Sequence, residues 1–175
     1  MKKSQLRLMI KEEILKEDEL KQYGIKKLRG ALTIEKIKKR CPWILKAKIK
    51  DADIGWTKDF LEWYDGTWIS GTWKDGNFRN GIWKNGIWES GSFYGKIWEN
   101  GTWKKGNFFG KTWKNGTWEN GYWGAGTWEN GTWKNGRWST GIWKKGKWIK
   151  GQTADQNMGT SPNRGWHPIS PADIQ

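Results

Sequence analysis

The sequence predicts a mainly β repeat protein: a β-solenoid of about 15 residues per coil with three faces, preceded by a small α-helical N-terminal segment. Three observations predict this fold class. Aromatic residues fall at every fifth position from Trp68 to Trp148, glycines recur between them, and charges alternate in sign at a stride of fifteen. The chain of 175 residues contains 18 Trp and 24 Gly. Such internal periodicity is the signature of repeat architectures.

The five-residue period favours strands over helices. The phrase "GTWENGTWKNG", residues 126–136, is typical of the repeats. Every fifth residue cannot follow one stripe of a helix with 3.6 residues per turn, and a glycine in every unit would weaken a helix repeatedly. Short strands joined by Asn-Gly or Lys-Gly turns fit this pattern.

The residue after each aromatic sets the length of the coil. Two series reverse sign at every step of fifteen residues: Lys84, Glu99, Lys114, Glu129, Lys144 and Lys74, Glu89, Lys104, Glu119, Lys134. Opposite charges on neighbouring strands are favourable and like charges are unfavourable. Stacked coils of fifteen residues would therefore place Lys84 beside Glu99.

An antiparallel meander of very short strands with Asn-Gly turns is the alternative fold. It would pair Trp83 with Trp88 across a hairpin and place all aromatics on one face. The meander leaves the alternation of charge unexplained, whereas the solenoid must hold three large rings in each layer of a narrow core.

Four segments follow one another along the chain. Residues 1–43 form a basic helical segment, with helices expected over 4–23 and 34–40. Residues 44–65 form a transition strand, in which Leu45, Ala47 and Ile49 alternate with lysines. Residues 66–151 form the Trp/Gly repeats. Residues 152–175 lose the repeat, gain prolines, and are expected to be an extended tail.

The net charge of +14 suggests an anionic partner. Residues 1–50 carry 16 Lys or Arg against six Asp or Glu. The candidate contacts with an anionic partner such as a nucleic acid are Lys36, Lys38, Lys39, Arg40, Lys46, Lys48 and Lys50. This set lacks a recognised nucleic-acid module, so a charged surface that docks on an acidic neighbour is an equal alternative.

Several function classes find little support. Cys41 is the only cysteine and His167 the only histidine, so nucleophile–base catalysis lacks its residues. Asp51, Asp53 and Asp59 match no known calcium loop. We expect no enzyme activity, no cofactor and no metal site. The N-terminus is too charged for a signal peptide, and no apolar run is long enough to span a membrane, so a cytoplasmic or virion location is expected.

The third face differs from the other two. Alternation along a strand places the repeat aromatics inside and their neighbours outside. Tyr94 and Phe109 would then be exposed on adjacent coils, beside two glycines that leave room for close approach. The candidate residues for docking a protein partner are Arg79, Tyr94, Gly95, Phe109, Gly110 and Tyr122. The alternative is that the chain's own tail or N-terminal helices cover this patch.

The repeats resemble the pentapeptide-repeat family. The likeness is best at Ala47–Ile49 and Ala52–Ile54, which show the family's alanine–polar–apolar pattern. Over residues 66–151 Gly replaces Ala and Trp replaces Leu or Phe. The resemblance implies a solenoid, although the family's β-helix is four-sided and has a longer coil.

Two further likenesses concern the setting of the protein. The Gly/Trp units are similar to repeats of uncharacterised phage and bacterial proteins, and "MKKSQLRLMIKEEILK" is similar to basic helices that open some tailed-phage structural proteins. The leading hypothesis is therefore a non-enzymatic structural or assembly protein that docks onto protein neighbours, with a phage virion as its setting. Nucleic-acid binding through the basic segment is the alternative, and glycan binding by exposed Trp is a weaker one.

Overall fold

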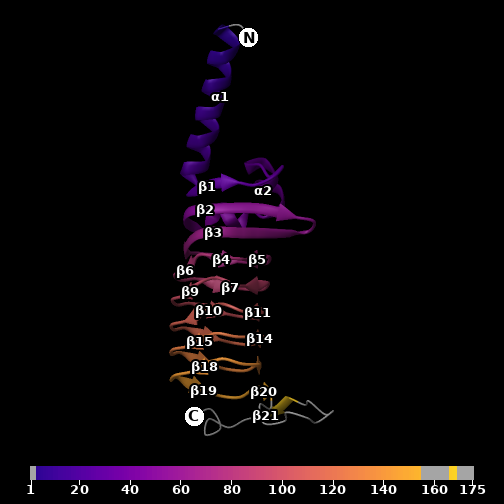
Figure 1. Ribbon diagram of the computed structural model, residues 1–175, viewed down its shortest axis with the longest axis vertical. Coiled ribbons are helices and arrows are strands. Elements are labelled where there is room, and N and C mark those ends of the chain that lie inside the picture. The colour runs from indigo at the N-terminus through magenta and orange to yellow at the C-terminus, as the bar shows by residue number, and fades with distance from the viewer. Residues whose placement is uncertain (1–2, 155–165, 169–175) are drawn as a thin grey trace.

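The computed structural model describes residues 3–154 and 166–168, and in it the repeats wind into a parallel β-solenoid (Figure 1). Each short strand pairs in parallel with the strand fifteen residues later, so Trp83 lies beside Trp98. Trp88 pairs with Trp73 and Trp103, not with Trp83. The solenoid with fifteen residues per coil is confirmed, and the meander is wrong.

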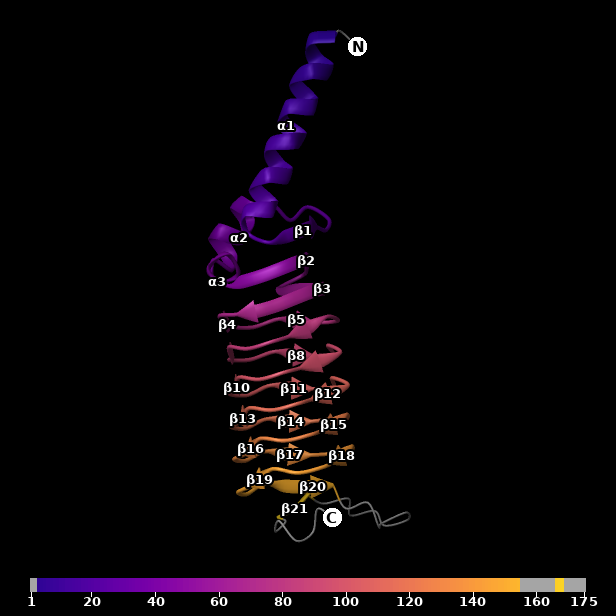
Figure 2. The same ribbon diagram turned by 90° about the vertical axis from the view of Figure 1, so that its left-hand side faces the viewer.

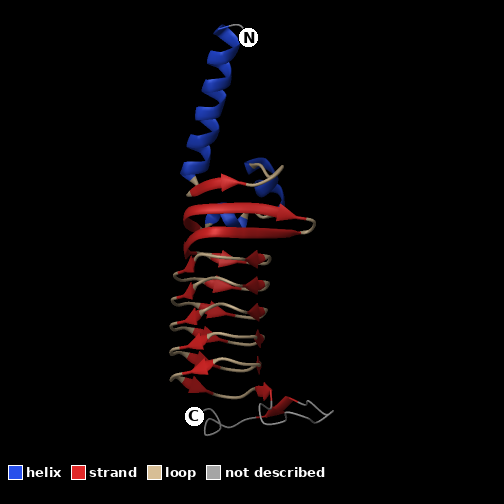
Figure 3. Ribbon diagram, in the orientation of Figure 1, coloured by secondary structure: helices blue, strands red, loops and turns tan. Residues whose placement is uncertain are grey.

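Three faces run along the solenoid, with one two-residue strand per coil on each (Figures 1 and 3). Face A contains β6 (Ile82–Trp83), β9 (Ile97–Trp98), β12 (Thr112–Trp113), β15 (Thr127–Trp128) and β18 (Ile142–Trp143). Face B contains β4 (Thr72–Trp73), β7 (Ile87–Trp88), β10 (Thr102–Trp103), β13 (Thr117–Trp118), β16 (Thr132–Trp133) and β19 (Lys147–Trp148). Face C contains β5 (Asn77–Phe78), β8 (Ser92–Phe93), β11 (Asn107–Phe108), β14 (Tyr122–Trp123), β17 (Arg137–Trp138) and β20 (Gln152–Ala154).

The long strand β3 (Phe60–Ser70) begins two of these faces. Its first half pairs with β5 and its second half with β6, so faces A and C belong to one sheet. Face B is a separate sheet of six strands.

Corner glycines let the chain turn from face to face. At Gly101 the backbone φ is +124°, a conformation that side chains disfavour. A Cβ there would also overlap the carbonyl oxygen of Gly86 on the previous coil. That oxygen accepts the backbone hydrogen bond from Thr102 at 2.9 Å. The corner thus needs glycine both for its backbone angle and for the close contact between coils.

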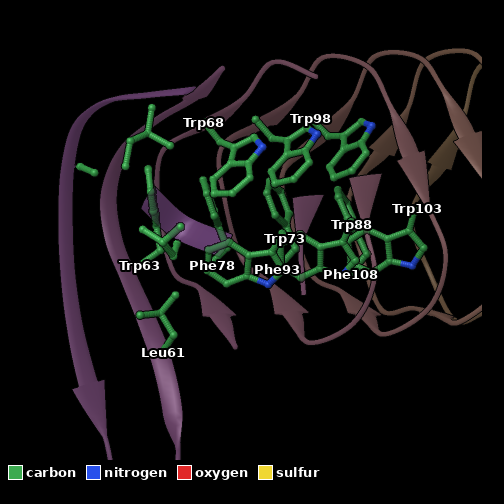
Figure 4. Packing of buried hydrophobic residues seen from close by; sticks show 14 of the residues in the cluster. Leu61, Trp63, Trp68, Trp73, Phe78, Trp88, Phe93, Trp98, Trp103 and Phe108 are labelled. Atoms are coloured by element: carbon green, nitrogen blue, oxygen red, sulfur yellow. The ribbon is translucent and has the colours of Figure 1, made fainter. Parts of the chain in front are cut away.

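The core consists of three columns of stacked rings (Figure 4). Within a column, rings of successive coils are nearly parallel, as in Trp83 and Trp98 with centroids 4.7 Å apart and planes 5° apart. Between columns the rings meet edge to face, as in Trp98 and Trp103 at 72°. Both arrangements are preferred by aromatic pairs and contribute about 0.5–1.5 kcal/mol each beyond burial. Three rings per layer therefore fit because neighbouring columns present edges to faces.

The alternating charges form ion pairs between coils. Glu89 pairs with Lys104 at 3.2 Å, and Glu119 pairs with Lys134 at 3.3 Å. Two further pairs, Glu99–Lys114 and Glu129–Lys144, lie on face A. In all four the lysine belongs to the coil after the glutamate. These side chains are substantially exposed, so each pair contributes at most about 1 kcal/mol.

A helical and stranded cap covers the first coil. It consists of β1 (Ile25–Leu28), α2 (Ile34–Arg40), α3 (Trp43–Lys46) and β2 (Lys48–Thr57), and β2 pairs with β1 and with β3. Thr33 caps α2 by accepting a hydrogen bond from the Lys36 amide. Trp43 contacts Trp73 with centroids 5.1 Å apart and closes the top of the core. Residues 43–46 are helical, so the strand predicted from Leu45 begins only at Lys48.

The helix α1 (Lys3–Gln22) projects from the capped end along the long axis (Figures 1 and 2). It ends before Gly24, whose φ of +68° is the left-handed conformation that commonly follows the end of a helix. Met9, Ile14 and Leu15 on this helix are exposed. No helix among the described residues combines the length and apolar character needed to cross a membrane.

At the opposite end, β21 (Trp166–Pro168) pairs antiparallel with β20. The other residues of the predicted extended tail, 155–165 and 169–175, lie outside the described part of the chain.

Candidate partner-binding surfaces

Four residues predicted to dock a partner come together on face C. Arg79, Tyr94, Phe109 and Tyr122 form what we call the aromatic column. The rings of Tyr94 and Phe109 stack with centroids 5.2 Å apart and planes 11° apart. Phe109 also contacts Tyr122 at 5.8 Å, and the Arg79 guanidinium lies 5.4 Å from the centre of the Tyr94 ring. Tyr94 and Phe109 are each 39% exposed.

A buried carboxylate fixes the start of the column. Glu62 is only 3% exposed and accepts two hydrogen bonds from Arg79, at 2.7 and 3.1 Å. Thr57 and Asn77 each donate a further bond at 2.8 Å. Burial by itself raises the pKa of the Glu62 carboxyl, but these hydrogen bonds outweigh it and hold the pKa below its ordinary value. Arg79 is therefore held in one orientation under Tyr94.

Two glycines assigned to the docking surface lie in the interior instead. Gly95 and Gly110 are buried. A Cβ on Gly110 would lie 2.7 Å from the Phe108 ring and 2.8 Å from the Phe93 ring, and one on Gly95 would meet Phe93 as closely. These glycines make room for core rings, so the prediction that they open the surface beside Tyr94 is wrong.

A different glycine supports the column. Gly124 follows Phe109 by one coil and is buried beneath it, because a Cβ at Gly124 would overlap the Phe109 ring. The Phe109 side chain therefore rests on backbone, which limits its freedom to rotate.

Two lysines flank the aromatic column. Lys96 and Lys111 follow Tyr94 and Phe109 by two residues, at the corner after face C, and both are exposed. Neither makes an ion pair with another described residue. Because the charge of Arg79 is balanced by Glu62, these two lysines give the surface around the rings its positive charge.

The seven residues predicted to contact an anionic partner do not form one patch. Lys36, Lys39 and Arg40 line one pocket beside Trp56, which we take up below. Lys38 is paired with Glu35 at 2.8 Å and with Glu19 at 3.6 Å.

The other three of these lysines lie elsewhere. Lys46 lines a second pocket with Trp43 and Lys74, and Lys50 lines a third with Lys21. Lys48 is exposed at the start of β2. Of the seven candidate contacts, Lys36, Lys39 and Arg40 thus share one pocket beside Trp56.

The environments of Cys41 and Asp53, which were considered for catalysis and metal binding, are those of structural residues. Cys41 is buried, and loss of solvation raises its pKa to about 11, so the thiol stays protonated at neutral pH. Asp53 pairs with Arg29 at 2.7 Å. Within residues 3–154 and 166–168, no group of three or more His, Cys, Asp or Glu side chains could hold a metal ion.

Two features of these surfaces were missed in the sequence. Glu62 occupies the position before Trp63, which is in phase with the repeats, and Asn77 lies fifteen residues later. The stride of fifteen could have revealed this contact. Trp56 precedes the regular repeats, and its position beside α2 depends on the cap, for which the sequence offers no period.

Searches against protein-family models, curated proteins and solved structures found no match to this chain. The resemblance to the pentapeptide-repeat family therefore remains an expectation from the repeat pattern.

Proposed function

We propose that the chain is a non-enzymatic structural or assembly protein that docks a protein neighbour through the aromatic column. The observation that carries this proposal is the pair of exposed, mutually stacked rings of Tyr94 and Phe109 on the repeat surface. Interfaces are enriched in aromatic and Arg side chains, and a few such residues supply most of the binding energy.

The surroundings of the column indicate the chemistry of the partner. Lys96 and Lys111 flank the rings with positive charge, so an acidic protein segment fits this surface best. We further propose a tailed-phage particle as the setting of this scaffold. This proposal rests on the resemblance of the N-terminal sequence and the Gly/Trp repeats to phage proteins.

Rigidity supports the role of a scaffold. Each coil is joined to its neighbour by backbone hydrogen bonds, such as that from the Lys104 amide to the Trp88 carbonyl at 2.8 Å. The three stacks of rings in the core join the coils as well. The column rings are therefore held in place before a partner arrives, which lowers the entropy lost on binding.

Site-specific photo-crosslinking tests the proposal. A benzophenone amino acid is placed at position 94, and a matched control is placed at position 87, where Ile87 on face B is 38% exposed. Crosslinking is performed in the native setting of the protein. We expect an acidic protein to be captured from position 94 and not from position 87.

A pair of substitutions completes this experiment. The double variant Tyr94→Ser/Phe109→Ser should lose the partner identified by the crosslink, and Ile87→Ser should retain it. Equal capture from both positions, or full retention by the double variant, contradicts the proposal.

Glycan binding by exposed Trp is not proposed. The indoles of face A and face B from Trp68 to Trp133 are fully buried and present no ring face to a sugar, and Tyr94 and Phe109 each cover one face of the other. A sugar needs a free ring face on which to stack. Nucleic-acid binding stays a prediction, and a salt titration of DNA or RNA binding tests it.

A further inference from the structure

A pocket of about 430 Å³ lies between α2 and the hairpin formed by β2 and β3. It is lined by Ala31, Leu32, Lys36, Lys39, Arg40 and Trp56. Its volume falls in the range of small-molecule sites. It lies in the cap, apart from the aromatic column, so it has no part in the docking proposed above.

Three cations meet in this pocket without a carboxylate partner. Neither Lys39 nor Arg40 makes an ion pair with any described residue, and the Lys36 ammonium donates to the Ala31 carbonyl oxygen. Glu35 on α2 and Asp53 on β2 are engaged elsewhere, Glu35 with Lys38 and Asp53 with Arg29. The pocket therefore presents positive charge that its own walls do not neutralise.

Trp56 gives the pocket a flat wall with a fixed orientation. Its Nε1 donates to the Lys58 carbonyl oxygen at 2.7 Å, across the turn of the hairpin. The Arg40 guanidinium lies 5.2 Å from the centre of the indole ring. A cation over an aromatic ring is favourable, and the ring leaves the guanidinium N–H groups available to an oxyanion.

We infer that this pocket binds a nucleotide: the phosphate contacts Arg40 and the two lysines, and the base stacks against the Trp56 indole. Arginine matches phosphate oxygens with paired N–H groups, and lysine adds charge. Bases stack readily on aromatic rings and on guanidinium planes. The nucleotide can be free or belong to a single strand, because both present the same groups.

Calorimetric titration of the full chain tests this inference, with AMP, inorganic phosphate, adenosine and a short oligothymidylate as probes. We expect AMP to bind at least tenfold more tightly than phosphate or adenosine, since only AMP uses both the cations and the ring. Tighter binding of the oligonucleotide than of AMP assigns the site to single strands, and the reverse order assigns it to free nucleotides.

Substitutions locate the binding. Arg40→Gln should weaken AMP binding at least tenfold, and Trp56→Leu should reduce the affinity for AMP to that for phosphate. Lys46→Gln removes one positive charge from the same segment outside this pocket and should change the affinity less than twofold. Tyr94→Ser, in the aromatic column, should leave AMP binding unchanged, which separates this inference from the proposed function.

Three results would overturn the inference: no binding of AMP or of the oligonucleotide at low salt, equal affinity for AMP and phosphate, or equal losses in Arg40→Gln and Lys46→Gln. The last result would mean that net charge, and not the pocket, attracts anions. If circular dichroism shows that Trp56→Leu disturbs the fold, Arg40→Gln still tests the inference, because Arg40 is exposed and its replacement should leave the fold intact.

Discussion

Removal of Arg79 should destabilise the protein more than removal of its partner Glu62. In Arg79→Gln, the buried Glu62 carboxylate keeps only Thr57 and Asn77 as donors, and a buried charge left without its partner costs about 3–5 kcal/mol. In Glu62→Gln, the Arg79 guanidinium is 47% exposed and water can solvate it, so the loss is that of charge-assisted hydrogen bonds, about 1.5–3 kcal/mol. The expected difference in free energy of unfolding is about 1–2 kcal/mol.

The pH dependence of stability provides a second test of this prediction. The Glu62 pKa is lowered in the folded protein, so its contribution is present above the ordinary carboxyl pKa of about 4.3 and is lost as the pH falls through the folded value. Without Arg79, burial should raise that pKa, and protonation then relieves the unpaired charge as the pH falls. The stability gap between wild type and Arg79→Gln should therefore narrow from about pH 7 to about pH 4.

Urea unfolding of wild type and both single variants at the two pH values measures these differences. Comparison with wild type at each pH cancels the titration of other carboxyl groups. A loss in Glu62→Gln equal to or larger than that in Arg79→Gln would refute the reasoning, as would a gap that does not change with pH.

Two other predictions concern the coils. Gly101→Ala should lower the free energy of unfolding, measured by chemical denaturation, by about 3 kcal/mol or more. The substitution adds backbone strain of about 1–3 kcal/mol to an overlap with the Gly86 carbonyl. Gly30 also has a positive φ but lies in open space, so Gly30→Ala should lower the free energy of unfolding less. Lys134→Glu should cost about 1 kcal/mol or less in low salt. Glu119→Lys in the same chain should restore part of this loss, because the new lysine faces the new glutamate but also adjoins Lys104. A loss unaffected by salt or by the second change would exclude the ion pair as its cause.

The coil could be predicted from the sequence because its contacts recur at a fixed spacing along the chain. The core aromatics, the corner glycines and four Glu–Lys pairs contact the equivalent position one coil away, so a stride of fifteen exposes these contacts directly. The same logic placed Tyr94 beside Phe109 on the third face. Residues that repeat are thus assigned correctly as a class once the period is known.

The remaining features depend on contacts outside the period. Gly95 and Gly110 follow the core aromatic by two residues, whereas a corner glycine such as Gly101 follows it by three. Only the positions of the Phe93 and Phe108 rings show that Gly95 and Gly110 face inward. The helix at 43–46 is set by Trp43, which must cover the first layer of rings. The alternating pattern over Leu45–Ile49 does not reveal this contact between Trp43 and the first layer of rings.

The third face shows how a repeat can produce a surface at small conformational cost. Pairing of the core strands fixes successive coils about 4.8 Å apart, which is also close to the distance at which aromatic rings stack. Two aromatics placed after the core residue on consecutive coils, as at Tyr94 and Phe109, must therefore stack at 5.2 Å whatever partner they meet. On faces A and B the same positions carry Lys and Glu, whose pairs satisfy each other. Face C replaces that pairing with rings and unpaired lysines, so its attractive groups are directed to solvent and are available to another molecule.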